Sequence, residues 1–347
     1  MIWLTWRQYR VQTLVALAAL VAVTAALVIT GFQLRDTYDS TVAVCGSDCG
    51  AARNAFVTRY STLSAFVTGL LIAVPGLMGV FWGAPLIARE LETGTHRLIW
   101  NQSITRTHWL GVRLTAVGLA AVAVTALLSL TVTWWASPLD EVNSDRFTPV
   151  VFDGRGIVPL AYAAFAFTVG VCAGLLIRRT VPAMAATLAV FVAVQVLMPF
   201  AVRPHFMTPV RTEIALAALT LRGGGPGEDG NGTAASRSGW EATNISMSGE
   251  GDAAQVVVGA ARPGAWVVSG SSPVLDSSGR EVRGAEGCAQ RDIDPVECFA
   301  KSDLHVEVVH HPADRYWTFQ WIESGVFLAL AGLLTGFCTW WLRRRLN

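Results

Sequence analysis

Apolar residues in this chain gather in long runs that short polar segments separate. The runs contain almost no charged side chains, and they cover residues 13–34, 62–87, 114–136, 157–177, 183–202 and 319–342. An α-helix needs about 20 residues to cross the hydrocarbon core of a bilayer, and each run is close to that length. The pattern therefore predicts an all-α polytopic membrane protein with six transmembrane helices.

The composition supports this class, because polar surface is scarce. Hydrophobic residues make up 52% of the 347 residues and charged residues only 15%, whereas soluble domains carry about 25% charged residues. Together with the six runs, these values exclude a soluble enzyme, a nucleic-acid-binding module and a secreted protein. The net charge of +1 is less informative than the placement of the charges.

The placement of arginine predicts the orientation in the membrane. If the N-terminus is cytoplasmic, the inner segments hold Arg7, Arg10, Arg89, Arg97, Arg106, Arg113, Arg178, Arg179 and Arg343 to Arg345. The two short outer loops carry more acidic than basic residues. Cytoplasmic loops normally carry the excess of Lys and Arg, so we expect a multi-pass protein of the plasma membrane with both termini in the cytoplasm.

The polar segments suggest four regions. Residues 1–12 alternate aromatic and basic side chains, which is typical of a helix lying in the membrane interface; the alternative is that they simply flank the first span. Residues 13–202 hold spans one to five, and residues 318–347 hold the sixth span and a basic tail. Residues 203–317 form a long external insertion with a flexible Gly/Ser-rich linker at 222–239.

Within the insertion, short β-branched segments predict a small β-containing extracytoplasmic domain between helices 5 and 6. The expected strands are at 255–258, 265–269 and 304–309. A weakly apolar stretch at 210–221 suggests a short helix at the membrane edge.

Four cysteines fall in predicted external segments, where disulfides persist: Cys45, Cys49, Cys288 and Cys298. Three pairings are open, and we favour the local pairs Cys45–Cys49 and Cys288–Cys298. Zinc is the alternative at Cys45 and Cys49, although no His lies near them in the sequence. Cys172 and Cys338 lie inside spans, where we expect free thiols that act as small apolar residues.

The chemistry that the sequence lacks narrows the function. A phosphate-binding P-loop needs Lys after a glycine-rich turn, and the one Lys, Lys301, has no such turn before it. The chain therefore has no nucleotide site of this kind and is not expected to be an enzyme. The spans hold no Asp, Glu or His except Glu323, near the external mouth of the sixth, which weighs against proton-coupled transport.

One cluster of His and carboxylate residues leaves a metal site open. If 304–309 is a strand, His305 and Glu307 share one face and His310 lies on the other. A polar strand edge is the simpler interpretation. We expect no metal and no cofactor bound by this chain.

Small residues recur at helical spacing inside the spans: Gly79/Gly83, Gly170/Gly174 and Gly332/Gly336. Such pairs let helices approach closely in lipid. Packing within the six-helix bundle is favoured over a dimer interface. Pro75 and Pro85 predict a kinked or broken second helix.

The segment at 88–110 is the strongest functional candidate, since it presents apolar residues on a predicted cytoplasmic loop. Its candidate residues are Arg89, Glu90, Glu92, Gly94, Thr95, Arg97, Leu98, Trp100 and Arg106. Gly94 can end the preceding helix. The cluster around Leu98 and Trp100 fits a short helix that docks in a partner's groove, with anchoring at the membrane interface as the alternative.

These residues resemble the permease subunits of ATP-binding-cassette (ABC) exporters of the type-2 class. The spacing Glu90-x-x-x-Gly94-Thr95, then Leu98, then Ser103-x-x-Arg106, and a cation at Arg113, is similar to that family's first cytoplasmic loop. The six spans, the basic ends and the long insertion before the last helix match its layout. The amino-acid sequence at residues 1–10, 81–106 and 173–185 resembles that of actinobacterial members of the family.

The resemblance implies a function. Two such permeases, a homodimer or a pair with a related chain, would form the membrane core, and each would bind a separate ABC ATPase subunit that holds ATP and Mg. Closure of the ATPases would push on the coupling loop, and the bundle would export an amphiphilic substrate. Two alternatives stay open: a non-transporting signal transducer that moves its external domain, and a membrane-embedded enzyme using the histidine cluster at 305–311.

Overall fold

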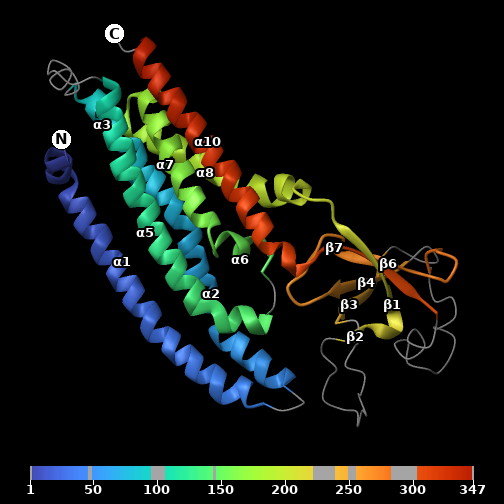
Figure 1. Ribbon diagram of the computed structural model, residues 1–347. Coiled ribbons are helices and arrows are strands. Elements are labelled where there is room, and N and C mark those ends of the chain that lie inside the picture. The colour runs from blue at the N-terminus through green and yellow to red at the C-terminus, as the bar shows by residue number, and fades with distance from the viewer. Residues whose placement is uncertain are drawn as a thin grey trace. The chain divides into compact units, whose positions relative to one another are not determined.

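The computed structural model describes residues 2–45, 49–94, 106–143, 146–221, 239–248, 255–282 and 303–345. The chain divides into two compact units, which we call the bundle and the β unit (Figure 1). The bundle comprises residues 1–142, 149–206 and 317–347, and the β unit comprises residues 143–148 and 207–316.

The bundle consists of helices joined by short turns in its described residues. Its long helices are α1 (Ile2–Tyr38), α2 (Gly50–Met78), α5 (Arg106–Asn143), α7 (Val158–Ile177), α8 (Thr180–Leu197) and α10 (Tyr316–Arg345). Shorter segments are η1 (Asp39–Ala43), η2 (Gly79–Gly83), α3 (Ala84–Glu92), α6 (Pro149–Asp153), η3 (Met198–Val202) and η4 (Arg203–His205). Six helical segments of the described chain are long and apolar enough to cross a membrane, which confirms the predicted number of spans.

The second span is interrupted, as its two prolines predicted. Pro75 lies inside α2, the π-helical turn η2 follows, and Pro85 lies in the first turn of α3. Proline removes a backbone donor and clashes with the preceding turn, while the N-terminal turn tolerates it because its N–H has no helical partner. The span therefore switches from α-helix to a π-helical turn at η2 and returns to α-helix at α3.

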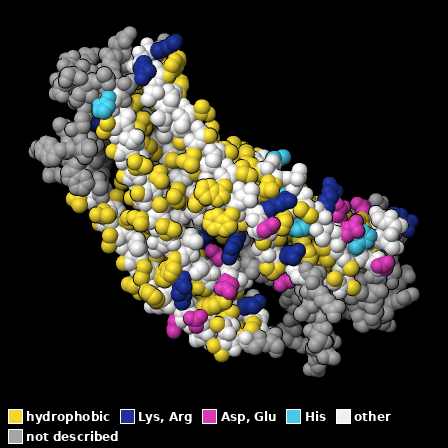
Figure 2. Space-filling view, viewed as in Figure 1, with side chains coloured by type: hydrophobic (Ala, Val, Ile, Leu, Met, Phe, Trp, Pro, Cys, Tyr) yellow, Lys and Arg dark blue, Asp and Glu magenta, His cyan; other side chains and the backbone are white. Residues whose placement is uncertain are grey.

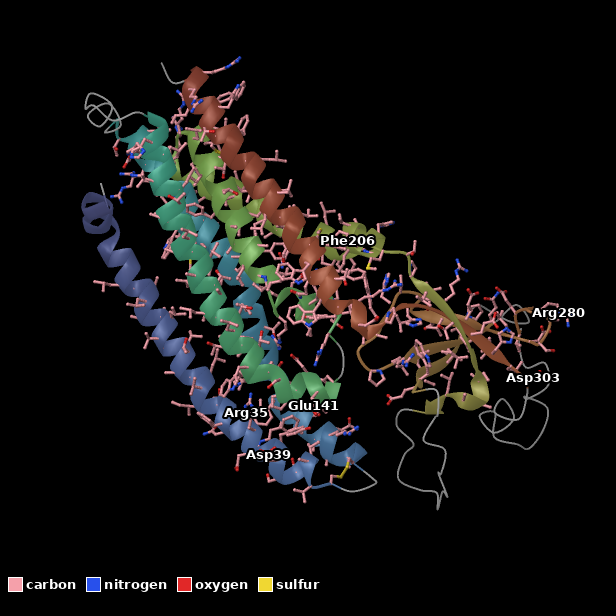
Figure 3. All side chains as sticks on the ribbon, viewed as in Figure 1. Arg35, Asp39, Glu141, Phe206, Arg280 and Asp303 are labelled. Atoms are coloured by element: carbon pink, nitrogen blue, oxygen red, sulfur yellow. A yellow bond between two sulfur atoms is a disulfide. The ribbon has the colours of Figure 1, made fainter. Side chains whose placement is uncertain are left out.

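Several hydrophobic clusters stabilise the described part of the bundle, and two of them are large. The first joins α1, α2 and α5 through residues such as Leu27, Phe56, Leu71 and Trp135. At the end of α1, Arg35 donates to the carbonyl of Trp134 at 2.6 Å, so this helix turns its arginine toward α5 (Figure 3). The second cluster joins α3, α5, α7 and α10 and includes Leu86, Trp109, Phe167 and Leu342.

Helix α7 is the centre of the bundle, and α1 is its most exposed helix. Of the most apolar window of each span, 67% is buried in Val158–Ile177 but only 11% in Leu14–Ala43. Apolar side chains cover the visible side of the bundle (Figure 2). An extended surface of this kind would be unstable in water and is what a helix bundle presents to lipid.

The β unit contains one sheet, and its described strands follow the order β1-β7-β6-β4-β3-β2, with β5 pairing on β7. The strands are β1 (Val210–Ala215), β2 (Thr220–Leu221), β3 (Glu241–Ser248), β4 (Gln255–Ala261), β5 (Trp266–Val267), β6 (Ser271–Leu275) and β7 (His305–His311). The pairings are antiparallel except for β2 with β3. Two short helical turns, η5 (Leu216–Ala218) and η7 (Ala313–Arg315), complete the unit.

Alternation explains the strands that the sequence predicted. Val256 and Val258 of β4 and Val306 and Val308 of β7 point into one core, as the two-residue period of a strand requires. The helix expected at 210–221 was wrong. That stretch starts with β1, which pairs with β7 along six residues, because β-branched and charged residues alternate there and the neighbouring strand supplies the hydrogen bonds that a short amphipathic helix would lack.

The described cysteines are all joined in disulfides. Cys45 and Cys49 are bonded, with Cα atoms 5.6 Å apart. The expectation of free thiols at Cys172 and Cys338 was wrong, because these residues are bonded to each other and link α7 with α10. Sequence distance concealed this pair, since 166 residues separate the two positions. Cys288 and Cys298 lie outside the described residues.

Candidate functional site

The segment that the sequence singled out begins with a regular helix end. Helix α3 closes at Glu92, the Thr93 amide donates to the carbonyl of Arg89, and Gly94 has a positive φ of 72°. Glycine adopts this left-handed conformation without steric cost, which is why it ends helices. The helix therefore ends at Glu92, and Gly94 turns the chain away from it, where the sequence indicated.

Glu90 faces the interior of the bundle. It is 4% exposed, and its carboxylate accepts a hydrogen bond from the guanidinium of Arg113 on α5. That guanidinium also lies 4.7 Å from the ring centre of Trp109, a favourable cation–π position. Glu90 and Arg113, which the resemblance placed in one motif, thus form an ion pair inside this chain.

Glu92 connects α3 to a third helix. One of its carboxylate oxygens accepts hydrogen bonds from the backbone N–H of Thr180 at 2.9 Å and from the Thr180 hydroxyl at 2.7 Å. Thr180 is the first residue of α8, whose early N–H groups have no partner within the helix. An acidic side chain at that end also interacts favourably with the helix dipole.

The remaining predicted site residues divide into two groups. Arg89 is exposed at the end of α3. Four of them lie outside the described residues: Thr95, Arg97, Leu98 and Trp100. Arg106 begins α5, and the structure describes its backbone alone. What the structure contributes is therefore the framework on both sides of the loop at 95–105: α3 tied to α5 through Arg113 and to α8 through Thr180.

A second polar site, which the sequence analysis missed, lies inside the bundle. Arg203 is fully buried and donates to two carboxylates, those of Asp153 and Glu323. Its Nε–H and one Nη donate to the two oxygens of Glu323 at 2.8 and 2.9 Å. Bidentate pairs of this kind are the strongest that arginine forms with a carboxylate. We call Arg203, Asp153 and Glu323 the charge cluster.

Neutral polar groups surround the charge cluster. The Tyr162 hydroxyl donates to Glu323 at 2.8 Å, and the Gln195 amide donates to Asp153 at 3.4 Å. The ring of Phe152 lies 4.1 Å from the guanidinium carbon of Arg203. The site therefore brings together α6, α7, α8, η4 and α10.

Gln320 docks α10 next to this cluster. Its side-chain oxygen accepts from the amides of Ile157 and Val158, at 3.1 and 3.2 Å, and its NH2 group donates to the carbonyls of Phe152 and Arg155. The first two bonds satisfy amides at the start of α7 that have no partner within the helix. The residue before Gln320, Phe319, packs its ring 5.9 Å from that of Phe206, which follows η4 (Figure 3).

A one-to-one ion pair lies close to the cluster. Arg155 donates to Asp140 of α5 at 3.2 Å and to the hydroxyl of Thr68 on α2 at 3.3 Å. The positive charge of Arg155 is thus matched by one carboxylate, whereas the Arg203 guanidinium contacts two.

The sequence analysis missed the charge cluster because its members lie at the edges of apolar runs. Asp153 and Arg203 were assigned to external polar segments, and Glu323 was placed near the mouth of the sixth span, whereas all three are buried. One signal was available: Gln320, Glu323 and Ser324 lie at i, i+3 and i+4 of an otherwise apolar helix. Residues at these spacings share a helix face, so a polar stripe directed into the bundle was readable.

The glycine pairs also find their partners inside the bundle. A Cβ on Gly83 would lie 2.5 Å from the carbonyl oxygen of Phe167, and one on Gly174 would lie 2.5 Å from that of Ala84. Gly79 and Gly170 approach the opposing backbone in the same way. Two of the three predicted pairs thus serve packing within the chain, between α7 and the η2–α3 segment, as favoured. Among the described residues, no atom outside the helix's own backbone lies within 4 Å of a Cβ placed on Gly332 or Gly336.

The histidine cluster of β7 has no metal-binding geometry. His305 and Glu307 share one face of the strand, and His310 is buried on the other. Glu307 pairs with Arg211 of β1 at 3.0 Å. Among the described residues, no group of three His, Cys, Asp or Glu side chains could hold a metal ion.

Comparison with known proteins agrees with the helical architecture. A family described as "ABC-2 membrane transporter related" matches residues 17–203, which is more than half of the chain and includes the first five spans. No curated protein and no solved structure gives a match. The matched region contains α3, α5 and α8, the three helices joined by Glu90 and Glu92. Because the match covers more than half of its residues, this chain belongs to the ABC-2 membrane transporter related family and is a membrane permease of that type.

Proposed function

We propose that this chain is the membrane-spanning subunit of an ABC exporter, driven by an ATPase on a separate polypeptide that acts on the loop at 95–105. The observation that carries the proposal is the framework beside that loop. Glu90 bonds to Arg113 and Glu92 bonds to Thr180, so the helices that lead into and out of the loop are fixed to each other and to α8.

This framework suits the transmission of force. Force applied between α3 and α5 moves the bundle only if these helices are joined to their neighbours, and α3, α5 and α8 are joined here by charged or charge-assisted hydrogen bonds. Such bonds are stronger than neutral ones. The backbones of α3 and α7 are also in close contact at Gly174. A displacement of the loop would therefore move several helices together.

The further elements of the proposal come from the sequence and the family. The loop and both termini would be cytoplasmic and the β unit extracytoplasmic, as the distribution of arginine favours. ATP and Mg would be bound by the partner, and two permeases would form the complete core. The substrate would be amphiphilic, as the resemblance to type-2 exporters implies.

The test uses an ABC ATPase that co-purifies with this chain from its source cells, and the two subunits are then co-expressed and purified together. Trp100→Ala removes an aromatic of the loop, and truncation of such an interface anchor costs about 2 kcal/mol or more. We expect the variant to insert normally and to lose most of the bound ATPase, or its stimulated ATP hydrolysis. The matched control is Trp321→Ala, since Trp321 is 67% exposed on α10, far from the loop in the sequence.

Two results would contradict the coupling role. One is unchanged ATPase binding and activity in a Trp100→Ala/Arg106→Ala double variant. The other is an equal loss in Trp321→Ala. Transport and signalling are separated by a different readout: vesicle uptake driven by ATP supports export, whereas ATP-dependent change in the protease sensitivity of the β unit without transport supports the signal transducer.

A further inference from the structure

The charge cluster contains one more negative than positive group. Arg203 contacts Asp153 and Glu323, and these three side chains are between 0 and 4% exposed. The nearest other pair, Arg155 with Asp140, is balanced by itself. With both carboxyl groups ionised, the cluster would carry a net charge of −1 inside an apolar bundle.

An uncompensated buried charge is expensive. Removing an ion from water costs several kcal/mol even after relaxation, and a buried acid usually avoids this cost by binding a proton. Two carboxylates that share one cation also repel each other, which favours protonation of one of them. The geometry therefore calls for a neutralising proton.

We infer that the charge cluster is a proton-binding site, in which the Asp153 carboxyl takes up one proton from water at or below neutral pH and returns it at higher pH. The site is independent of the proposed coupling to an ATPase, because it depends only on contacts within the bundle.

The hydrogen bonds identify Asp153 as the protonated member. Both oxygens of Glu323 accept from Arg203, and one of them also accepts from Tyr162. The Asp153 carboxyl receives Arg203 on one oxygen, while its second oxygen has only the long bond of 3.4 Å from Gln195. The second oxygen of Asp153 is thus the least stabilised of the four carboxylate oxygens as an anion.

Burial acts in the same direction. It raises the pKa of the Asp153 carboxyl to about 7, with Arg203 opposing the increase and Glu323 adding to it. The charged and titratable groups around Asp153 are Arg203 from η4, Glu323 from α10 and Tyr162 from α7. From α2, the neutral hydroxyl of Thr68 accepts a hydrogen bond from Arg155, next to the cluster.

Gln195 can serve both protonation states. Its NH2 group donates to the Asp153 carboxylate, while its own oxygen is buried and has no hydrogen-bond partner among the described residues. Rotation of the amide by a half turn would present that oxygen to a protonated Asp153, which would then donate to it. The two ends of a side-chain amide differ little in shape, so this exchange needs no rearrangement of α8.

The first test compares melting temperatures of the purified full-length chain and its variants in detergent. Asp153→Asn mimics the protonated acid. A raised folded-state pKa stabilises the folded chain at low pH, and this contribution is lost as pH rises through about 7. The Tm of Asp153→Asn minus that of the wild type should therefore increase by about 3 °C or more between pH 5.5 and pH 8.0.

Asp140→Asn is the matched control, because it removes the same charge from the balanced pair with Arg155. Its Tm difference from the wild type should be the same at both pH values. An Asp153→Asn difference that does not change with pH, or that falls at high pH, overturns the assignment.

A measurement on the wild type covers the case in which Asp153→Asn does not fold. Infrared spectra should show the C=O stretch of a buried carboxylic acid at pH 6, and this band should disappear reversibly by pH 8.5. Gln195→Leu should shift the frequency of the band, because it removes the hydrogen-bond partner. A wild-type spectrum without such a band at pH 6 overturns the proposal.

Discussion

Glu90 and Arg113 form a buried ion pair between α3 and α5, although 23 residues separate them along the chain. The two residues lie on opposite sides of the loop at 95–105. The pair therefore holds the end of α3 to the first turns of α5 inside the bundle. The arrangement makes Glu90 a structural partner of Arg113, whereas the resemblance alone suggested a residue of the coupling loop.

The first prediction concerns this pair. Glu90→Ala and Arg113→Ala should each lower the stability of the bundle by about 3–5 kcal/mol, because each leaves an unpaired charge in the interior. The double variant should lose clearly less than the sum of the two. Denaturant titration of the purified chain in detergent would give the three values.

Glu92→Ala is the comparison for this experiment. Glu92 is exposed and acts only at the start of α8, so its removal should cost about 1 kcal/mol, as for a helix cap. Equal and mild effects of Glu90→Ala and Glu92→Ala would show that the Glu90–Arg113 pair does not hold α3 to α5.

The second prediction concerns the thiols. The chain has six cysteines, and four of them form the pairs Cys45–Cys49 and Cys172–Cys338. Thiol counting under denaturing, non-reducing conditions should therefore find at most two free thiols, those of Cys288 and Cys298. Mass spectrometry of non-reduced peptides would identify the pairs, and six free thiols would refute both.

The third prediction uses the glycines as a matched set. Gly83→Ala and Gly174→Ala should each destabilise the bundle by about 1–3 kcal/mol, the usual cost of overpacking, because the new Cβ would meet an opposing carbonyl oxygen. Gly332→Ala and Gly336→Ala should have no such cost, since their surroundings are open. Melting temperatures of the four variants in one detergent would test this, and a similar loss in all four would contradict the packing.

The fourth prediction is the membrane orientation. In intact cells, an impermeant maleimide should label Ser278→Cys in the β unit, and it should label Arg179→Cys between α7 and α8 only after permeabilisation. Both positions are exposed. Labelling is compared with that of the parent chain. The opposite pattern would reverse the orientation that the arginine distribution favours.

Hydrophobic length made the helices readable in the sequence. A run of 20 apolar residues has few alternatives to a membrane helix, so the six spans, the break at Pro75 and Pro85 and the end of α3 at Gly94 could all be located. Strand alternation located β4 and β7 for a similar reason. These features depend on neighbours within a few residues.

Pairing between distant residues could not be read in the same way. Arg203 meets Asp153 and Glu323 across 50 and 120 residues, and Cys172 meets Cys338 across 166. Burial of a charged side chain depends on which helices pack together, and no local pattern specifies that. β1 was missed for the same reason, because its hydrogen bonds come from β7, almost 100 residues later.

The last prediction rests on His311 at the end of β7. The side chain is fully buried, its ring lies 5.3 Å from that of Trp266, and Arg315 approaches its Nδ1 at 3.4 Å. Burial lowers the pKa of His311 to about 4, and the positive charge of Arg315 lowers it further. His311 is therefore neutral in the folded β unit at neutral pH.

Because the folded-state pKa lies below the unfolded value of about 6.5, the unfolded chain binds more protons between pH 6.5 and pH 4. The β unit should thus lose stability as the pH falls through this range, by at most about 1.4 kcal/mol per pH unit, and should be insensitive to pH above 7. Hydrogen-exchange protection of the β7 amides, corrected for the intrinsic rate at each pH, would measure the loss. His311→Gln should be less protected than the wild type at pH 7.5, since the ring contact with Trp266 is removed. The difference in protection between the variant and the wild type should be smaller at pH 5. Only the wild type has an imidazole whose protonation lowers stability there. A difference that stays constant with pH would show that another group dominates the acid response of the β unit.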